Sequence, residues 1–283
     1  MHLRHFLTIT CLCSILGCTS FTYERLLREG KITDFNIHSG HFEHRVFKST
    51  LLIQESFKTP LYLYIGGDGR PWRTFREVAS NPTSEHSIVL KSMLQAEPNS
   101  MYIGRPCYYQ VADARCQGTW WTHDRYHPDV VNSLLKVVEQ LSESHKELWL
   151  IGYSGGGTLA VLVGRRLNRP VNVVTVNANL DHQAWTNHHQ YSPLTGSLNP
   201  IRDLKRNPEM RELHWHANQD RTVLPEWIVA YCEKTQTRCL PFEGSHTSWT
   251  SLWPSMLHCS QNVFRQSGNS VQAVPVPENC LRP

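Results

Sequence analysis

The chain has 283 residues, with 28 Lys and Arg against 24 Asp and Glu, and a formal net charge of +4. Hydrophobic residues make up 40% of the sequence and charged residues 18%, a balance that supports a buried core and argues against disorder or a polybasic, nucleic-acid-binding tail. No apolar run reaches the roughly 20 residues that a membrane-spanning helix needs. We therefore expect a globular protein that neither binds nucleic acid nor spans a membrane.

The N-terminal segment has the features of an export signal. Arg4 and two histidines precede an apolar run from Phe6 to Leu16, long enough for a signal peptide and too short to cross a bilayer. Ile15-Leu16-Gly17-Cys18 resembles the lipobox of bacterial lipoproteins, in which the chain is cut before the cysteine and its sulfur is lipidated. The alternatives are a buried first helix or a secretion signal without a lipid.

The lipobox resemblance implies a signal peptide at residues 1–17, lipidation of Cys18 and a polar tether over residues 18–30. A lipid on Cys18 would anchor the protein to a membrane of the bacterial cell envelope. Ser20 stands where an acidic residue would favour the inner membrane, so the resemblance favours the outer membrane.

Beyond residue 30, short β-rich apolar segments alternate with longer helical ones. Two alternating runs within 31–53, around Ser39-Gly40, predict an antiparallel hairpin. The alternation of strands and helices predicts one α/β domain over residues 31–283, with a mostly parallel sheet covered by helices on both faces. The further predicted strands are 61–65, 101–104, 148–153, 171–176, 213–216 and 238–242, and the clearest predicted helices are 128–145 and 157–167.

Residues 182–210 are rich in His, Asn and Pro and break this alternation. They are predicted to form an insertion near the carboxyl edge of the sheet, where open α/β folds bind their ligands.

The sequence Gly152-Tyr153-Ser154-Gly155-Gly156 follows a predicted strand and precedes a predicted helix. A serine on such a sharp turn needs small neighbours, because strand and helix approach closely there. At this motif the chain resembles the α/β-hydrolase fold, over roughly residues 31–260. The resemblance makes Ser154 the candidate nucleophile; the alternative is a plain glycine turn.

A serine nucleophile needs a base, and the base needs an orienting carboxylate. The chain order in this fold is Ser, acid, His. His246 follows the last predicted strand and is the candidate base. Asp220 is the candidate acid, because residues 217–225 resemble the G-x-x-D-x-x-V-P segment of the family, with Ala217 in place of the usual Gly. Asp181, which follows the preceding strand, is the rival acid.

An oxyanion hole requires two backbone N–H donors. The resemblance assigns one to Gly155 and the second to the loop after residue 65, at Asp68 first and Gly67 second. Gly66 stands where the family motif has His. A nucleotide-binding role for this loop is disfavoured, because the Lys-[Ser/Thr] ending of a P-loop is missing.

The nine cysteines divide into two groups. Cys11, Cys13 and Cys18 belong to the export segment, and an even number remains. Closing a short loop costs less chain entropy than closing a long one, so we predict disulfides between cysteines that are neighbours in the sequence. Export to an oxidising compartment would allow such disulfides to form. The predicted pairs are Cys107–Cys116, Cys232–Cys239 and Cys259–Cys280. The alternative is a set of buried thiols. No C-x-x-C pair supports a zinc site.

His214 and His216, two apart on one strand, provide a pair of potential metal ligands, but no carboxylate–histidine cluster accompanies them. We therefore expect neither a metal nor an organic cofactor. Four tryptophans near these motifs either line an acyl or aromatic pocket or belong to the core. They are Trp120, Trp121, Trp185 and Trp249.

The lipobox together with GGDGRPW, GYSGGG and SPLTGSLNP resembles a group of bacterial α/β-hydrolase-family lipoproteins. This resemblance implies a serine hydrolase that cleaves carboxylic esters or related small acyl compounds through an acyl-enzyme. The alternative, from another class, is an envelope binding or assembly protein that keeps the fold without turnover. The oligomeric state is left open.

Overall fold

The computed structural model describes residues 22–40, 42–50, 59–74, 76–84, 86–111, 113–203, 205, 207–266 and 280. The expected signal peptide, residues 1–17, and Cys18 lie outside this part of the chain. Among the described residues, no helix combines the length and the hydrophobicity needed to cross a bilayer.

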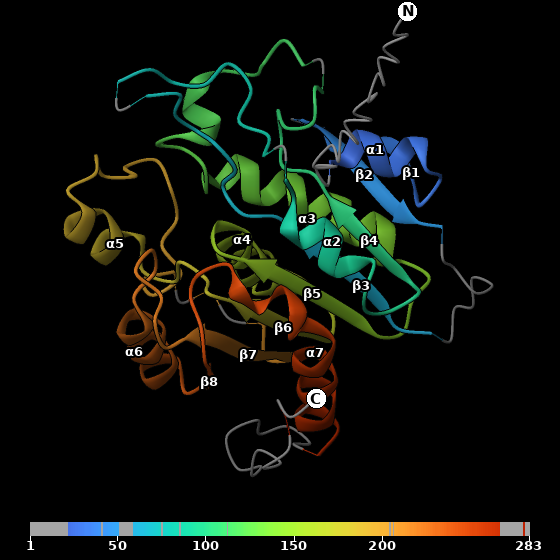
Figure 1. Ribbon diagram of the computed structural model, residues 1–283, viewed down its shortest axis with the longest axis vertical. Coiled ribbons are helices and arrows are strands. Elements are labelled where there is room, and N and C mark those ends of the chain that lie inside the picture. The colour runs from blue at the N-terminus through green and yellow to red at the C-terminus, as the bar shows by residue number, and fades with distance from the viewer. Residues whose placement is uncertain are drawn as a thin grey trace, which may run out of the picture.

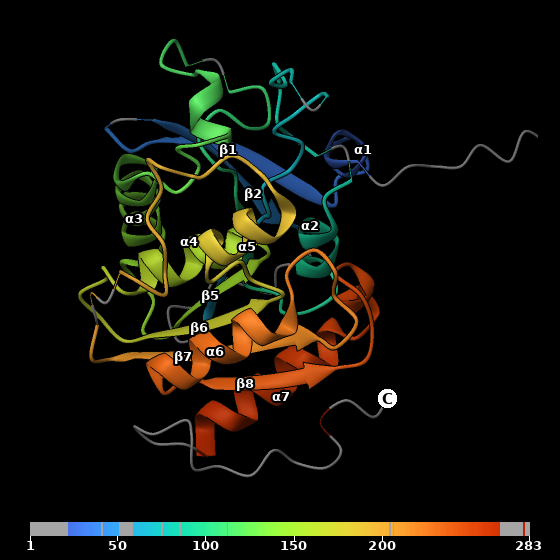
Figure 2. The same cartoon turned by 90° about the vertical axis from the view of Figure 1, so that its left-hand side faces the viewer.

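The described part of the chain forms a central sheet of eight strands, in the order β1-β2-β4-β3-β5-β6-β7-β8. β2 pairs antiparallel with both β1 and β4, whereas the remaining neighbours are parallel. Figure 2 shows β1 and β2 near the top of the sheet, followed downwards by β5, β6, β7 and β8. The strands are β1 (Ile32–His38), β2 (Glu43–Ser49), β3 (Leu61–Ile65), β4 (Ser100–Ile103), β5 (Leu148–Tyr153), β6 (Val171–Val176), β7 (Met210–Ala217) and β8 (Arg238–Phe242).

The predicted α/β architecture with a mostly parallel sheet is confirmed, including the entry hairpin of β1 and β2. Every residue of β3 and β6 is buried, as expected for parallel strands covered on both faces. β7 begins at Met210, three residues before the predicted start at residue 213, because its pairing with β6 extends back to Val171.

Helices cover both faces of this sheet (Figure 1). Adjacent residues of β7 identify the faces, because side chains alternate along a strand. His214 contacts Tyr231 of α6, whereas Trp215 donates its indole N–H to Ser260 of α7, 3.0 Å away. The described helices are α1 (Tyr23–Arg28), α2 (Ile88–Met93), α3 (Pro128–Ser142), α4 (Gly155–Gly164), α5 (His182–His189), α6 (Pro225–Thr235) and α7 (Trp253–Gln266), with 3-10 turns η1 (Gly118–Trp121) and η2 (Ser248–Ser251).

The two long predicted helices shift at their ends. α3 stops at Ser142 rather than at residue 145. The carbonyl of Ser142 accepts a hydrogen bond from the guanidinium of Arg169 at 2.6 Å. α4 starts at Gly155 rather than at residue 157, because the turn at Ser154 enters the helix directly. The first turn of α4 is thereby placed at the carboxyl end of β5.

The interpretation of residues 18–30 as a polar tether is wrong for the part that the structure describes. Tyr23 and Leu26, one helical turn apart in α1, are both buried. The Tyr23 ring packs edge-on against Tyr109, with centroids 5.2 Å apart, and against Phe47 of β2. This amphipathic turn therefore belongs to the folded domain, beside β1 and β2 in Figure 1.

All three predicted disulfides are present in the structure: Cys107–Cys116, Cys232–Cys239 and Cys259–Cys280. The first closes a loop between β4 and α3, and the second ties the end of α6 to β8. The predicted insertion at residues 182–210 contains α5 and irregular segments before β7.

Candidate active site

Ser154 lies at the turn between β5 and α4. Its backbone has φ 53° and ψ −125°, a strained combination for a residue with a side chain. A Cβ added to Gly152 would overlap backbone atoms of Gly156 and Gly157, and a Cβ on Gly156 would overlap the carbonyl of Ile65. Strand and helix are therefore so close that the flanking glycines are required, as predicted for a serine on such a turn.

The structure brings Ser154, His246 and Asp220 into one hydrogen-bonded chain. The Nε2 atom of His246 lies 3.2 Å from the Ser154 hydroxyl oxygen, and Nδ1 lies 2.6 Å from Oδ2 of Asp220. Because a carboxylate only accepts, Nδ1 carries the proton and donates it to Asp220. Nε2 is then free to accept from the Ser154 hydroxyl.

Each partner of this chain is held in place by its own loop. Asp220 is 3% exposed, and its second oxygen accepts from the backbone N–H groups of Thr222 and Val223, at 2.8 and 3.0 Å. The carbonyl of His246 accepts from the side-chain amide of Asn177, and its ring packs 5.0 Å from that of Tyr153. The carboxylate and the imidazole therefore keep one orientation relative to Ser154.

The rival acid, Asp181, is engaged elsewhere. Its side chain accepts from the backbone N–H groups of Gln183 and Ala184, so it caps the N-terminus of α5. It also accepts from the side-chain amide of Asn199, at 2.8 Å. These contacts give Asp181 a structural role, whereas the imidazole of His246 contacts Asp220.

The residues expected to form the oxyanion hole also lie around Ser154. A Cβ added to Gly67 would approach the Cβ of Ser154 to 3.5 Å, so the loop after β3 packs on the nucleophile turn. A Cβ added to Gly155 would overlap the carboxylate of Asp68. Gly66 replaces the His of the family motif for a local reason, because any side chain there would overlap the Tyr102 hydroxyl.

The side chains that surround Asp68 were not predicted from the sequence. Its carboxylate forms ion pairs with Arg105 and with Arg125, the latter at 2.7 Å, and accepts from the Tyr126 hydroxyl at 2.9 Å. Burial alone would raise the pKa of Asp68, but the two guanidinium groups hold that pKa well below its ordinary value. Arg105 and Arg125 are 20 positions apart in the sequence, and nothing in this spacing indicated that they meet.

The four tryptophans have different environments. Trp249 is 1% exposed and packs between Tyr153 and Trp253, so it belongs to the core behind the site. Trp121 is also buried, and its indole N–H donates to the Ala79 carbonyl. Trp120 and Trp185 are partly exposed, and Trp185 lies on α5.

α5 reaches the turn that carries the acid. His189 of α5 lies 2.9 Å from the carbonyl oxygen of Thr222, whose N–H binds Asp220. The Trp185 ring contacts His189 and Tyr191, and the guanidinium of Arg125 lies 5.9 Å from the Trp185 ring centroid. The insertion at residues 182–210 therefore contributes an aromatic wall next to the candidate site.

The two histidines of β7 have different environments. His214 is fully buried, with Nδ1 2.8 Å from the Thr175 hydroxyl and Nε2 3.3 Å from Glu212. Burial lowers the pKa of His216. Within the described ranges, no group of three or more His, Cys, Asp or Glu side chains is arranged to hold a metal ion.

No protein-family model matches the chain, and no curated protein matches it. Solved structures do. The chain is similar to the esterase Pf2001 of Pyrococcus furiosus, at 12% identity over 83% of this chain and 90% of that one, with a TM-score of 0.59. It is also similar to Est1E of Butyrivibrio proteoclasticus, at 14% identity over 82% and 98%, with a TM-score of 0.55.

A third similar structure is the carboxylesterase Cest-2923 of Lactobacillus plantarum, at 12% identity over 83% of this chain and 97% of that one, with a TM-score of 0.53. The strand order and these likenesses together establish the architecture. The chain has the α/β-hydrolase fold.

Proposed function

We propose that the protein is a serine hydrolase that cleaves carboxylic esters or related small acyl compounds through an acyl-enzyme. The observation that carries the proposal is the continuous chain of hydrogen bonds from Ser154 through His246 to Asp220. Three separate loops contribute these groups, so chance proximity is a poor explanation. Pf2001 and Cest-2923, described as an esterase and a carboxylesterase, make ester hydrolysis the first reaction to test.

In the proposed reaction, the Ser154 oxygen attacks the ester carbonyl as its proton moves to Nε2 of His246. The imidazolium that forms is stabilised by Asp220, and the backbone N–H groups of Gly155 and Asp68 bind the negative oxygen. His246 then returns the proton to the departing alcohol. A water molecule, deprotonated by the same imidazole, releases the acid and restores Ser154.

A fluorophosphonate probe tests the attacking residue, because it reacts covalently with an activated serine. We expect the native protein to be labelled, and Ser154→Ala to lose both the label and about 10⁵–10⁶-fold in kcat on p-nitrophenyl esters. Ser192→Ala, which removes an exposed serine, is the matched control and keeps both. Equal labelling of the native protein and Ser154→Ala would rule out Ser154 as the nucleophile.

The non-catalytic envelope binding protein remains the alternative outcome of the same assays. If the native protein neither turns over any ester of a chain-length series nor reacts with the probe, this alternative replaces the enzyme.

We also propose that the protein is tethered to a bacterial envelope membrane through a lipid on Cys18. The lipobox-like segment supports this, and so do the three disulfide pairs, since disulfides persist mainly in oxidising compartments.

A further inference from the structure

A buried ionic cluster lies next to the nucleophile, and the Ser–His–Asp chain does not account for it. Asp68 binds Arg105 and Arg125 through its two carboxylate oxygens, and both arginine side chains are 5% exposed or less. Buried ion pairs are a poor source of stability, because removing the charges from water costs about as much as their attraction returns. A cluster of this kind therefore calls for a role beyond stability.

The cluster restrains the backbone of Asp68 from two sides. Its carboxylate is held by the arginines and by Tyr126, and its own carbonyl oxygen accepts from the Tyr108 hydroxyl at 2.8 Å. Arg105 and Arg125 are in turn anchored to backbone carbonyls, those of Arg125 and Thr122, both at 2.7 Å. Asp68, whose backbone N–H is an expected oxyanion donor, is thus held through both its side chain and its carbonyl oxygen.

The charges in this cluster also favour a negative transition state. The Asp68 carboxylate packs directly on Gly155, the other expected donor. An isolated carboxylate at that place would repel the oxygen that becomes negative during attack. Two guanidinium groups against one carboxylate leave one net positive charge, so the repulsion is more than compensated.

We propose that Arg105 and Arg125 are positioning residues of the oxyanion hole, which fix the Asp68 peptide beside Ser154 and keep the local charge positive. This inference rests on the proposed function. It predicts that loss of an arginine weakens binding of the tetrahedral state without weakening binding of the ester itself.

The test compares Arg125→Gln, which removes the charge, with Arg125→Lys, which keeps the charge but loses the planar fork. Each is assayed for kcat and KM on a p-nitrophenyl ester, and for inhibition by an aryl trifluoromethyl ketone, which forms a tetrahedral oxyanion with the serine. We expect Arg125→Gln to lower kcat about 10²-fold at nearly constant KM. We expect the inhibitor affinity of Arg125→Gln to fall by a similar factor. Arg125→Lys should lose less kcat and less inhibitor affinity than Arg125→Gln.

Arg165→Gln is the matched control, because Arg165 is also buried and paired but with Glu212 and Tyr231, in a different part of the fold. It is expected to lower the melting temperature and to keep kcat within about threefold. A folded Arg125→Gln that also keeps kcat within about threefold, or that loses kcat without losing inhibitor affinity, overturns the proposal.

Should Arg125→Gln fail to fold, Tyr108→Phe decides, because it deletes only the hydroxyl that binds the Asp68 carbonyl. We expect kcat to fall about tenfold with the same parallel loss of inhibitor affinity; unchanged kinetics overturn the proposal. A native protein that neither labels nor turns over esters refutes the proposed function instead. An active native protein with unaffected variants refutes only the positioning role.

Discussion

Among single residues, the identity of the candidate acid depends on which carboxylate the imidazole of His246 contacts. Asp220 and Asp181 both follow parallel strands at the same edge of the sheet, β7 and β6 respectively. Asp220 binds Nδ1 of His246, whereas Asp181 is occupied by backbone N–H groups and by Asn199. Identical side chains in nearby positions thus have different roles, because their hydrogen-bond partners differ.

This difference predicts unequal effects of the same substitution. We expect Asp220→Asn to lower kcat about 10³–10⁴-fold, because an amide no longer stabilises the imidazolium and can favour the wrong tautomer. Asp181→Asn keeps a side chain that caps helices well, so kcat should stay within about threefold. The kcat of each variant is measured by ester hydrolysis, and circular dichroism checks that both variants are folded like the native protein. A larger loss for Asp181→Asn would assign the acid to that residue.

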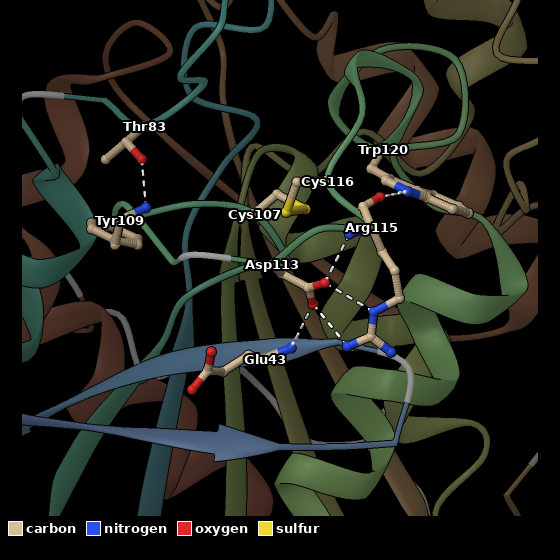
Figure 3. Close-up of a disulfide and its surroundings, with 8 residues drawn as sticks. All are labelled: Glu43, Thr83, Cys107, Tyr109, Asp113, Arg115, Cys116 and Trp120. Atoms are coloured by element: carbon tan, nitrogen blue, oxygen red, sulfur yellow. Dashed lines mark hydrogen bonds and ion pairs between the residues drawn. A yellow bond between two sulfur atoms is a disulfide. The ribbon is translucent and has the colours of Figure 1, made fainter.

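At the scale of elements, the segment between β4 and α3 supplies both arginines of the Asp68 cluster. Figure 3 shows its disulfide, Cys107–Cys116, among hydrogen bonds within the segment and to residues of β2 and of the loop that holds Thr83. Asp113 accepts from the backbone N–H of Glu43, and the N–H of Tyr109 donates to Thr83. Among the described residues of this segment, Cys107, Tyr109 and Gln110 have φ between +59° and +69°, which is strained for residues with a side chain.

Because the disulfide helps to hold this strained segment, its removal should affect catalysis as well as stability. We expect Cys107→Ser/Cys116→Ser to lower kcat about tenfold, since small displacements of positioning groups are costly in rate. Cys232→Ser/Cys239→Ser is the matched control: it opens a loop of similar length between α6 and β8 and should lower only the melting temperature. Equal losses of kcat in the two variants would show that the effect is not local.

At the scale of the whole molecule, the described domain starts with α1 packed on the sheet, directly after the segment that holds Cys18. If that cysteine carries a lipid, only a short stretch of chain separates the membrane from the folded domain. Anchoring would then keep the folded domain near the membrane surface, because each extended residue spans only about 3.5 Å.

The lipid anchor is tested by expression in a Gram-negative host fed radioactive palmitate. We expect the native protein to incorporate the label and to partition into detergent, and Cys18→Ser to do neither. Cys13→Ser, in the same segment but outside the lipidated position, should behave like the native protein. An unlabelled native protein that stays in the aqueous phase would contradict the lipid anchor, without bearing on the hydrolase proposal.

Features that depend on residues close together in the chain could be predicted from the sequence. Alternating apolar segments indicated the parallel sheet, since burial on both faces demands continuous hydrophobic strands. The glycines around Ser154 indicated the tight turn, the resemblance of residues 217–225 to a family segment indicated Asp220, and the end of the last predicted strand indicated His246. These signals come from residues close together in the chain, so they can be detected in the sequence alone.

Contacts between side chains that are distant in the sequence could be found only in the folded structure. The choice between Asp220 and Asp181, the burial of α1 and the convergence of Arg105 and Arg125 on Asp68 all depend on contacts across the fold. The two arginines lie 37 and 57 positions from Asp68, and His246 lies 92 positions from Ser154. No periodicity spans such separations, because they are set by how the loops pack at the edge of the sheet.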